Sequence, residues 1–192
     1  MNIGVLALQG AVREHIQMIE RCKARGISIK RPHELSLIDA LIIPGGESTT
    51  IGKLMEKYNF VETIRKLNAD GLPVYGTCAG LILLAKKITE GTQPLLKLMD
   101  IEVKRNAFGR QRESFEADLD ISELGSRSYK GVFIRAPWIE SVGQGVTIMA
   151  KFDGKIIMAR QDKLLVSAFH PELTGDCRIH EYFIEKFVKQ GC

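Results

Sequence analysis

Short apolar runs alternate with helical patterns along the first half of the sequence, and this alternation restricts the fold more than any other feature. The apolar runs predict strands at residues 2–8, 27–30, 40–43 and 73–77. The remaining segments have apolar residues at helical spacing and predict helices at residues 12–24, 48–57, 61–69 and 81–87. Such alternation is typical of a parallel sheet that is covered by helices on both faces.

The second half of the sequence has a different pattern, with strand-like segments separated by turns such as Asp153-Gly154. We expect strands at residues 101–104, 115–119, 131–134, 146–152, 155–160 and 164–169, and a closing helix at 178–189. No linker or repeat divides the chain. The sequence therefore predicts one α/β domain over residues 1–192. We expect a three-layer open sheet whose mostly parallel core carries added antiparallel strands.

Composition and charge argue against several classes of function. The chain has 192 residues, of which 45% are hydrophobic and 26% charged, a balance typical of globular proteins. Its basic residues are scattered and the net charge is only +4, so we expect no nucleic-acid partner. There is no signal-peptide pattern and no apolar run of roughly 20 residues, so we expect no membrane association and a cytoplasmic location. The cysteines show no metal-ligand spacing, and we expect free thiols, no metal and no cofactor.

Residues 73–80, Pro-Val-Tyr-Gly-Thr-Cys-Ala-Gly, are the most informative stretch for chemistry. An apolar strand leads into Gly-x-Cys-x-Gly and then into an apolar helix, which is the cysteine form of a nucleophile elbow. Gly76 and Gly80 permit a sharp turn that presents Cys78 at the start of the helix. A helix N-terminus favours the thiolate over the thiol, and the backbone N–H of Ala79 is placed to stabilise an oxyanion.

A buried structural cysteine is the alternative interpretation of Cys78, because free cysteine is among the most buried residue types. The elbow around Cys78 favours a nucleophile instead. The other three cysteines have no such surroundings. Cys22 lies on the apolar face of a predicted helix, which indicates core packing, and we assign no role to Cys177 or Cys192.

A cysteine nucleophile needs a group that carries protons, and His170 is the histidine best placed for that role. It follows the last predicted strand, and sites in open α/β sheets form at the carboxyl ends of strands, so His170 should meet the elbow. Glu172 lies two residues further on, on the same side of an extended segment, and would fix the imidazole tautomer. Alternatively, both are solvated turn residues. We expect a surface or interface position for His15, and solvated side chains for His33 and His180.

Residues 42–48, Ile-Ile-Pro-Gly-Gly-Glu-Ser, form a predicted strand that ends in a glycine turn before a helix. Ser48 is the expected N-cap of that helix. Glycines let the backbone approach a ligand closely, so an N–H of Gly45 or Gly46 would be a second oxyanion donor beside Ala79. The alternatives are a simple tight turn or a phosphate-binding loop, although the lysine of a P-loop is absent.

Together, the motifs Pro-Gly-Gly-Glu-Ser, Gly-Thr-Cys-Ala-Gly and Phe-His-Pro-Glu make the chain similar to the class I, or triad, glutamine amidotransferases. Over nearly its whole length the chain more closely resembles the glutaminase subunits of pyridoxal phosphate synthases. That closer resemblance rests on five segments, at residues 8–15, 44–50, 105–111, 114–118 and 132–137.

The resemblance implies hydrolysis of L-glutamine to L-glutamate and ammonia through a thioester, without metal or cofactor. It implies Cys78 as the nucleophile, His170 as the base and Glu172 as the group that orients the base. It also implies that Gln9 helps to form the oxyanion hole once a synthase subunit docks. That pyridoxal phosphate synthase subunit would receive the ammonia for the biosynthesis of pyridoxal 5'-phosphate, or vitamin B6.

The resemblance also implies a glutamine-binding site. Its members would be Gly46, Glu47, Ser48, Arg105, Ile134 and Arg135. The two arginines have a chemical reason to be there, because a guanidinium group pairs bidentately with a carboxylate such as that of glutamine. Judged from the residues alone, they are as well explained as ordinary solvated arginines.

Two other functions compete with this prediction. One is the glutaminase subunit of another amidotransferase, such as that of histidine biosynthesis, and the segments around Arg105 and Arg135 argue against it. The other is a binding module that keeps the fold without catalysis, and the intact set of Cys78, His170 and Glu172 argues against that.

Overall fold

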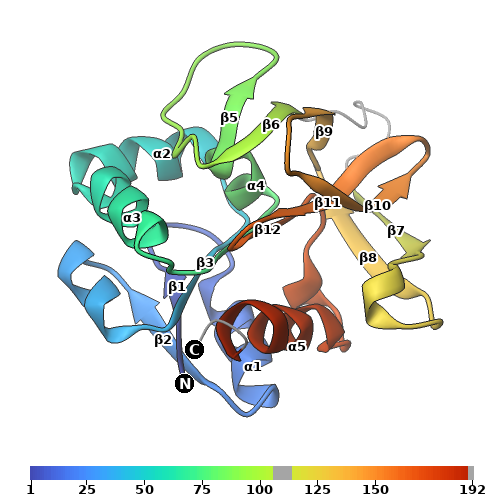
Figure 1. Cartoon of the computed structure of the whole chain (residues 1–192), viewed down its shortest axis with the longest axis horizontal. Helices are drawn as coiled ribbons and strands as arrows, with labels where there is room; N and C mark the ends of the chain where they lie inside the picture. Colours follow the sequence, from blue (N-terminus) through green and yellow to red (C-terminus); the bar gives the residue numbers. More distant parts are fainter. Residues whose placement is uncertain (106–113, 190–192) are drawn as a thin grey trace.

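A ten-stranded sheet forms the centre of the structure, which is a computed structural model that describes residues 1–105 and 114–189 (Figure 1). Its strands are β1 (Asn2–Leu6), β2 (Arg25–Ile29), β3 (Ala40–Ile43), β4 (Val74–Thr77), β5 (Ala85–Ile88), β6 (Met99–Lys104), β9 (Trp138–Val142), β10 (Thr147–Phe152), β11 (Lys155–Gln161) and β12 (Leu164–Ser167). They follow the order β2-β1-β3-β4-β12-β11-β9-β6-β5, and β10 pairs with β11 off this path. β7 (Ser114–Leu119) and β8 (Tyr129–Ile134) form a separate antiparallel pair.

The sheet has a parallel half and a mainly antiparallel half. Neighbouring strands from β2 to β12 run parallel, whereas β11, β9 and β6 pair antiparallel with their neighbours toward that half. β3, β4 and β12 are buried along their whole length, as expected of parallel strands that are covered on both faces. The predicted fold class, a mostly parallel core with added antiparallel strands, is confirmed.

Helices cover both faces of the parallel half and make three layers (Figure 1). The helices are α1 (Val12–Arg21), α2 (Ser48–Lys57), α3 (Phe60–Ala69), α4 (Ala79–Leu84) and α5 (Arg178–Phe183). In Figure 1, α1 and α5 lie on one side of the parallel strands, and α2, α3 and α4 lie on the other. The five strands and five helices therefore enclose one continuous set of buried apolar side chains in this half.

The register of the central strands brings three chain segments to one edge of the sheet. Gly76 of β4 pairs with Ile43 at the end of β3 and with Val166 near the end of β12. Because these strands are parallel, the residues that follow each of them emerge at the same edge. The Pro-Gly-Gly turn, the elbow and the segment of His170 are thus neighbours.

The predicted helix at residues 81–87 is partly wrong. α4 already ends at Leu84, and the chain continues as β5, whose Lys86 and Lys87 form ion pairs with Asp100 and Glu102 on β6. Those cross-strand pairs are formed with residues far along the sequence, so local periodicity did not indicate the strand.

Two further differences concern the second half of the chain. β9 was not predicted, although its Ile139 pairs with Ile156 of β11 and so joins β6 and β5 to the rest of the sheet. The closing helix begins as predicted at Arg178, but Ile184–Val188 has π-helical hydrogen bonding. Boundaries of the other predicted elements differ by a few residues.

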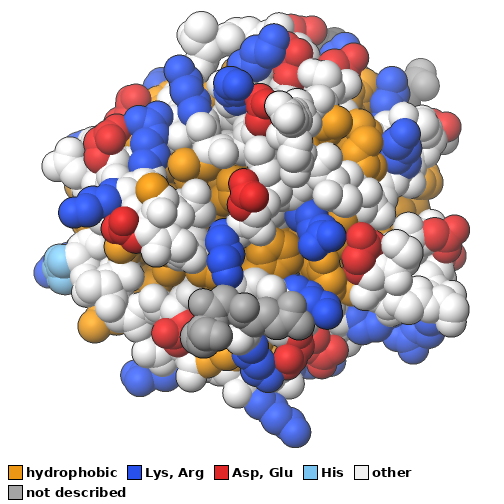
Figure 2. Space-filling model, viewed as in Figure 1, with side chains coloured by type: hydrophobic (Ala, Val, Ile, Leu, Met, Phe, Trp, Pro, Cys, Tyr) orange, Lys and Arg blue, Asp and Glu red, His pale blue; other side chains and the backbone are white. Residues whose placement is uncertain are grey.

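The face of the molecule in Figure 2 carries basic and acidic side chains that are interspersed, without a large area of one sign. This face therefore offers no electrostatic footprint for nucleic acid. Within residues 1–105 and 114–189, no helix is both long enough and apolar enough to cross a membrane.

Candidate active site

Cys78 stands in a sharp turn between β4 and α4. Its backbone has φ 49° and ψ −98°, which residues other than glycine rarely adopt. The glycines around it are needed for space: a Cβ on Gly76 would lie 2.5 Å from the carbonyl group of Gly80, and one on Gly80 would overlap the carbonyl oxygen of Ile43. The turn is therefore a strained strand-to-helix elbow, and Cys78 occupies the N-cap of α4.

His170 and Glu172 come next to this cysteine in a short segment after β12. Nδ1 of His170 lies 2.7 Å from Oε1 of Glu172, and both side chains are buried. The imidazole also interacts with the thiol of Cys78, and both groups flank Gly45. Since Nδ1 is engaged by the carboxylate, Nε2 is the ring nitrogen left for proton exchange with the sulfur.

The protonation of His170 follows from these contacts. Burial alone would lower its pKa, but the hydrogen bonds to Cys78 and Glu172 outweigh that effect and raise the pKa to about 10. Burial also acts to raise the pKa of Glu172, but the neighbouring imidazoles of His15 and His170 hold the pKa of this carboxyl below its usual value. At neutral pH the structure therefore favours an imidazolium between a carboxylate and the sulfur.

Two histidines that we did not assign to the site lie directly behind it. His15 and His180 are 0% and 1% exposed, so the predictions of a surface or interface position for His15 and of a solvated His180 are wrong. Their ring nitrogens, Nδ1 of His15 and Nε2 of His180, are 3.0 Å apart. Burial lowers the pKa of His15, and burial together with His15 lowers the pKa of His180 to about 3. Both imidazoles are thus neutral at neutral pH. His33 is exposed, as predicted.

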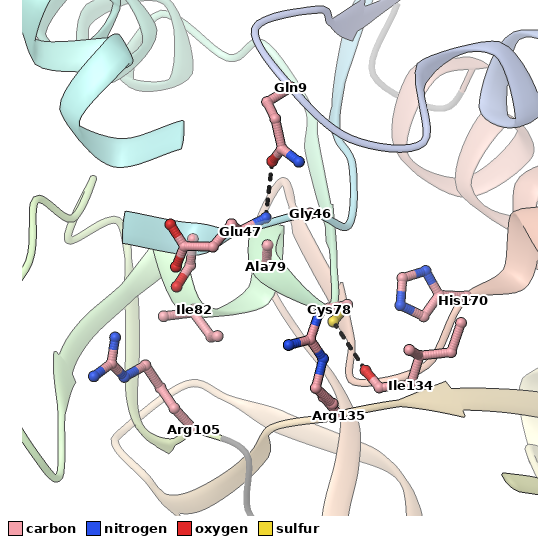
Figure 3. A pocket seen from close by; sticks show the side chains of 11 residues that line it. Gln9, Gly46, Glu47, Cys78, Ala79, Ile82, Arg105, Ile134, Arg135 and His170 are labelled. Carbon is pink, nitrogen blue, oxygen red and sulfur yellow. Dashed lines mark hydrogen bonds between the residues drawn. The ribbon is translucent and has the colours of Figure 1, made fainter. Parts of the chain in front are cut away.

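The Pro-Gly-Gly turn packs against the loop that follows β1. The carbonyl oxygen of Gly45 accepts a hydrogen bond of 3.1 Å from the N–H of Ala11. Because C=O and N–H of a trans peptide point in opposite directions, the N–H of Gly46 points away from that loop. Oε1 of Gln9 accepts a hydrogen bond of 2.8 Å from the N–H of Glu47, so the Gln9 side chain lies over the turn (Figure 3).

A cavity of about 290 Å³ opens at this edge of the sheet. Figure 3 shows Cys78 and His170 at one end of it, Glu47 and Arg105 at the other, and Arg135 between them. It is lined by Gln9, Gly46, Glu47, Ser48, Cys78, Ala79, Ile82, Arg105, Ile134, Arg135 and His170. The cavity thus brings together the predicted glutamine-binding residues. Glu172 lies behind His170, and Gly45 lies beside it.

Hydrogen bonds hold the far end of the cavity in place. Oε1 of Gln93, which the sequence did not single out, accepts from Oγ of Ser48 at 3.0 Å and from Nη1 of Arg105 at 2.9 Å. The N-cap of α2 is Glu47, whose carboxylate accepts from the N–H groups of Thr49 and Thr50, so the prediction of Ser48 as the cap is wrong. Gln93 lies in a loop without secondary structure, where no periodicity or motif marks it.

Arg135 has an unusual backbone for its residue type. Its φ of 43° lies in the left-handed region, directly after β8. The carbonyl oxygen of the preceding Ile134 lies 3.9 Å from the sulfur of Cys78. The left-handed turn therefore brings this strand end against Cys78, while the Arg135 side chain extends into the cavity (Figure 3).

Comparison with known proteins decides the family. A model of the SNO glutamine amidotransferase family matches residues 5–189. The chain belongs to this family. A relative from Pelotomaculum thermopropionicum, named pyridoxal 5'-phosphate synthase subunit PdxT, is 59% identical over 100% of this chain and 97% of its own length. A protein of the same name from Carboxydothermus hydrogenoformans is 59% identical over 98% of this chain and 99% of its own length.

A solved structure agrees with the family assignment. It is described as a glutamine amidotransferase, has 48% sequence identity and superposes with a TM-score of 0.91 over 95% of this chain and 97% of its own. The family is thus supported by both sequence and fold. In the described part of the chain, no group of three or more His, Cys, Asp or Glu side chains is arranged to hold a metal ion.

Proposed function

We propose that residues 1–192 form a single glutaminase domain that hydrolyses L-glutamine to L-glutamate and ammonia. In this proposal Cys78 is the nucleophile, His170 the general acid and base, and Glu172 the group that orients His170. The observation that carries the proposal is the contact of His170 with both Cys78 and Glu172 beside one cavity, in a chain of the glutamine amidotransferase family.

The reaction begins with attack of the Cys78 thiolate on the carboxamide carbon of glutamine. The backbone N–H of Ala79, at the N-terminus of α4, and those of Gly45 and Gly46 stabilise the oxyanion. His170, which is positively charged because its pKa is raised, gives its proton to the departing ammonia. The neutral imidazole then removes a proton from water, which hydrolyses the γ-glutamyl thioester and releases glutamate.

The far end of the cavity binds the amino-acid end of glutamine. Arg105 and Arg135 pair with the α-carboxylate, and Glu47 with the α-ammonium group. Gly46, Ser48 and Ile134 also line the cavity. Support comes from the distribution of charge, with two guanidinium groups and one carboxylate facing one small cavity (Figure 3).

The acceptor of the ammonia is a pyridoxal phosphate synthase subunit, and the product is pyridoxal 5'-phosphate, vitamin B6. Support comes from two relatives that carry the name pyridoxal 5'-phosphate synthase subunit and are 59% identical over 100% and 98% of this chain. We place the reaction in the cytoplasm, since it needs Cys78 as a free thiol and reducing compartments keep thiols free.

The test is ammonia release from glutamine, measured with and without the synthase subunit, for the native chain and for Cys78→Ala. The native chain with its partner should release ammonia, and Cys78→Ala should not. The chain alone should release ammonia slowly. Its Gln9 side chain accepts a hydrogen bond from the N–H of Glu47, so the oxyanion hole is incomplete before the synthase subunit docks. An active Cys78→Ala variant would refute the proposed nucleophile.

A further inference from the structure

His15 contacts both the elbow that carries Cys78 and the segment that carries His170 and Glu172. Its Nε2 lies 3.1 Å from Oγ1 of Thr77, the residue before Cys78, and 3.3 Å from Oε2 of Glu172. Its Nδ1 lies 3.0 Å from Nε2 of His180 on α5. The side chain is completely buried. One imidazole of α1 is therefore in contact with the elbow, with the carboxylate that orients His170, and with a second buried imidazole.

The two carboxylate oxygens of Glu172 differ, because Oε1 bonds to His170 whereas Oε2, which faces His15, is less well compensated. Oε2 of Glu172 makes no hydrogen bond within the described part of the chain, and the Glu172 side chain is 0% exposed. A buried carboxylate oxygen without compensation is costly. The hydroxyl groups of Tyr75 and Tyr129 are engaged elsewhere, since that of Tyr75 bonds to Ser167 and that of Tyr129 to Thr174. Nε2 of His15 is thus the group left to compensate this oxygen.

The hydrogen-bond partners decide where the protons of both histidines lie. If His15 carried its proton on Nδ1, the lone pair of its Nε2 would face the carboxylate of Glu172. Nε2 of His180 would then accept from His15, and the proton of His180 would lie on its Nδ1, a nitrogen that has no partner among the described residues. If His180 donates from Nε2 to Nδ1 of His15, then His15 carries its proton on Nε2, toward Thr77 and Glu172. Every ring N–H then has a partner.

We propose that His15 is a positioning residue of the glutaminase, which holds Thr77 and Glu172 in one arrangement through its Nε2–H, with His180 fixing its tautomer. The inference rests on the proposed function, since Glu172 must orient His170 for it to matter. His15 lies 63 residues before Cys78 and on another helix, so it ties α1 to the elbow and to the segment of His170.

A matched pair of substitutions separates this role from simple packing. His15→Gln places an amide N–H near the position of Nε2 and keeps the contact with Thr77 and Glu172. His15→Asn reaches only the position of Nδ1 and keeps the contact with His180. Ammonia release would be measured with the synthase subunit present. We expect His15→Asn to lower kcat roughly 10- to 100-fold with KM changed less than about 3-fold. The reason is that a displaced Glu172 would misplace His170 relative to Cys78 without changing how glutamine binds. His15→Gln should retain most of the native kcat.

Two controls complete the experiment. Met18→Ala removes a buried side chain one turn further along α1 whose polar contact is with Arg21 rather than with the proposed triad, and it should lower the thermal unfolding midpoint without the loss of kcat. In a double-mutant cycle, His15→Asn added to Glu172→Gln should lower kcat by less than about a further 2-fold, because both substitutions act through the same contact between His15 and Glu172. Equal kcat for the Gln and Asn variants, or additive losses in the cycle, would overturn the inference. If instead the native chain with its partner releases no ammonia, the proposed function itself fails.

Discussion

Replacing Gly45 with alanine tests the placement of His170 most sharply. A Cβ on Gly45 would lie 2.9 Å from Nδ1 of His170 and closer still to its Cε1, whereas carbon atoms in contact normally lie 3.5–4.0 Å apart. The ring or the turn must therefore move by about 1 Å or more. That movement would also disturb the 2.7 Å hydrogen bond between His170 and Glu172. A misplacement of this size costs on the order of 100-fold in rate, or about 2.7 kcal/mol of activation free energy.

The assay is steady-state ammonia release from glutamine with the synthase subunit present. Gly45→Ala should lower kcat about 100-fold. Gly175→Ala is the matched control, because a Cβ there meets no heavy atom within 4 Å, and its kcat should equal that of the native chain. Thermal unfolding of both variants shows how much of any loss comes from instability. A folded Gly45→Ala variant with native kcat would refute the placement of the imidazole beside this glycine.

Three further predictions follow from the same contacts. Arg105→Leu should raise KM for glutamine about 10- to 100-fold with a smaller change in kcat, measured by the same assay, because a charge-assisted hydrogen bond to the substrate is lost. The lowered pKa of His180, about 3, means that the unfolded chain takes up a proton below about pH 6.5 that the folded chain does not, so stability falls as pH falls. In urea unfolding at pH 7 and pH 5, His180→Gln should therefore lose about 2 kcal/mol less than the native chain. Iodoacetamide at pH 8 should modify Cys78 well before Cys22, as followed by peptide mass mapping, because burial and the nearby Cys177 raise the pKa of the Cys22 thiol to about 12.

The sequence was sufficient for the parts of the site that depend on local backbone chemistry. The Gly-x-Cys-x-Gly pattern at Cys78 requires glycines because strand and helix backbones approach too closely for any Cβ. His170 was placed by the rule that parallel strands end at one edge, and the register of β4 and β12 has that arrangement. These features are encoded within a few residues, so a single sequence reveals them.

The polar groups behind the site could not be predicted in the same way. His15 and His180 are buried because each supplies the other with a hydrogen-bond partner across 165 residues of sequence, and neither lies in a motif that indicates this. Gln93 was missed for the same reason, since its partners Ser48 and Arg105 come from other segments. Pairings between distant polar side chains leave no local periodicity, whereas apolar faces do.

The central claim is that Cys78 is the nucleophile for glutamine beside His170, and mass spectrometry of the trapped protein tests it most directly. The native chain with its synthase subunit would be treated with a chloroketone analogue of glutamine, then digested and mapped. We predict one adduct, on Cys78, that excess glutamine prevents and that His170→Asn slows strongly. Modification of a different residue, or of Cys78 at the same rate with and without glutamine, would contradict the claim.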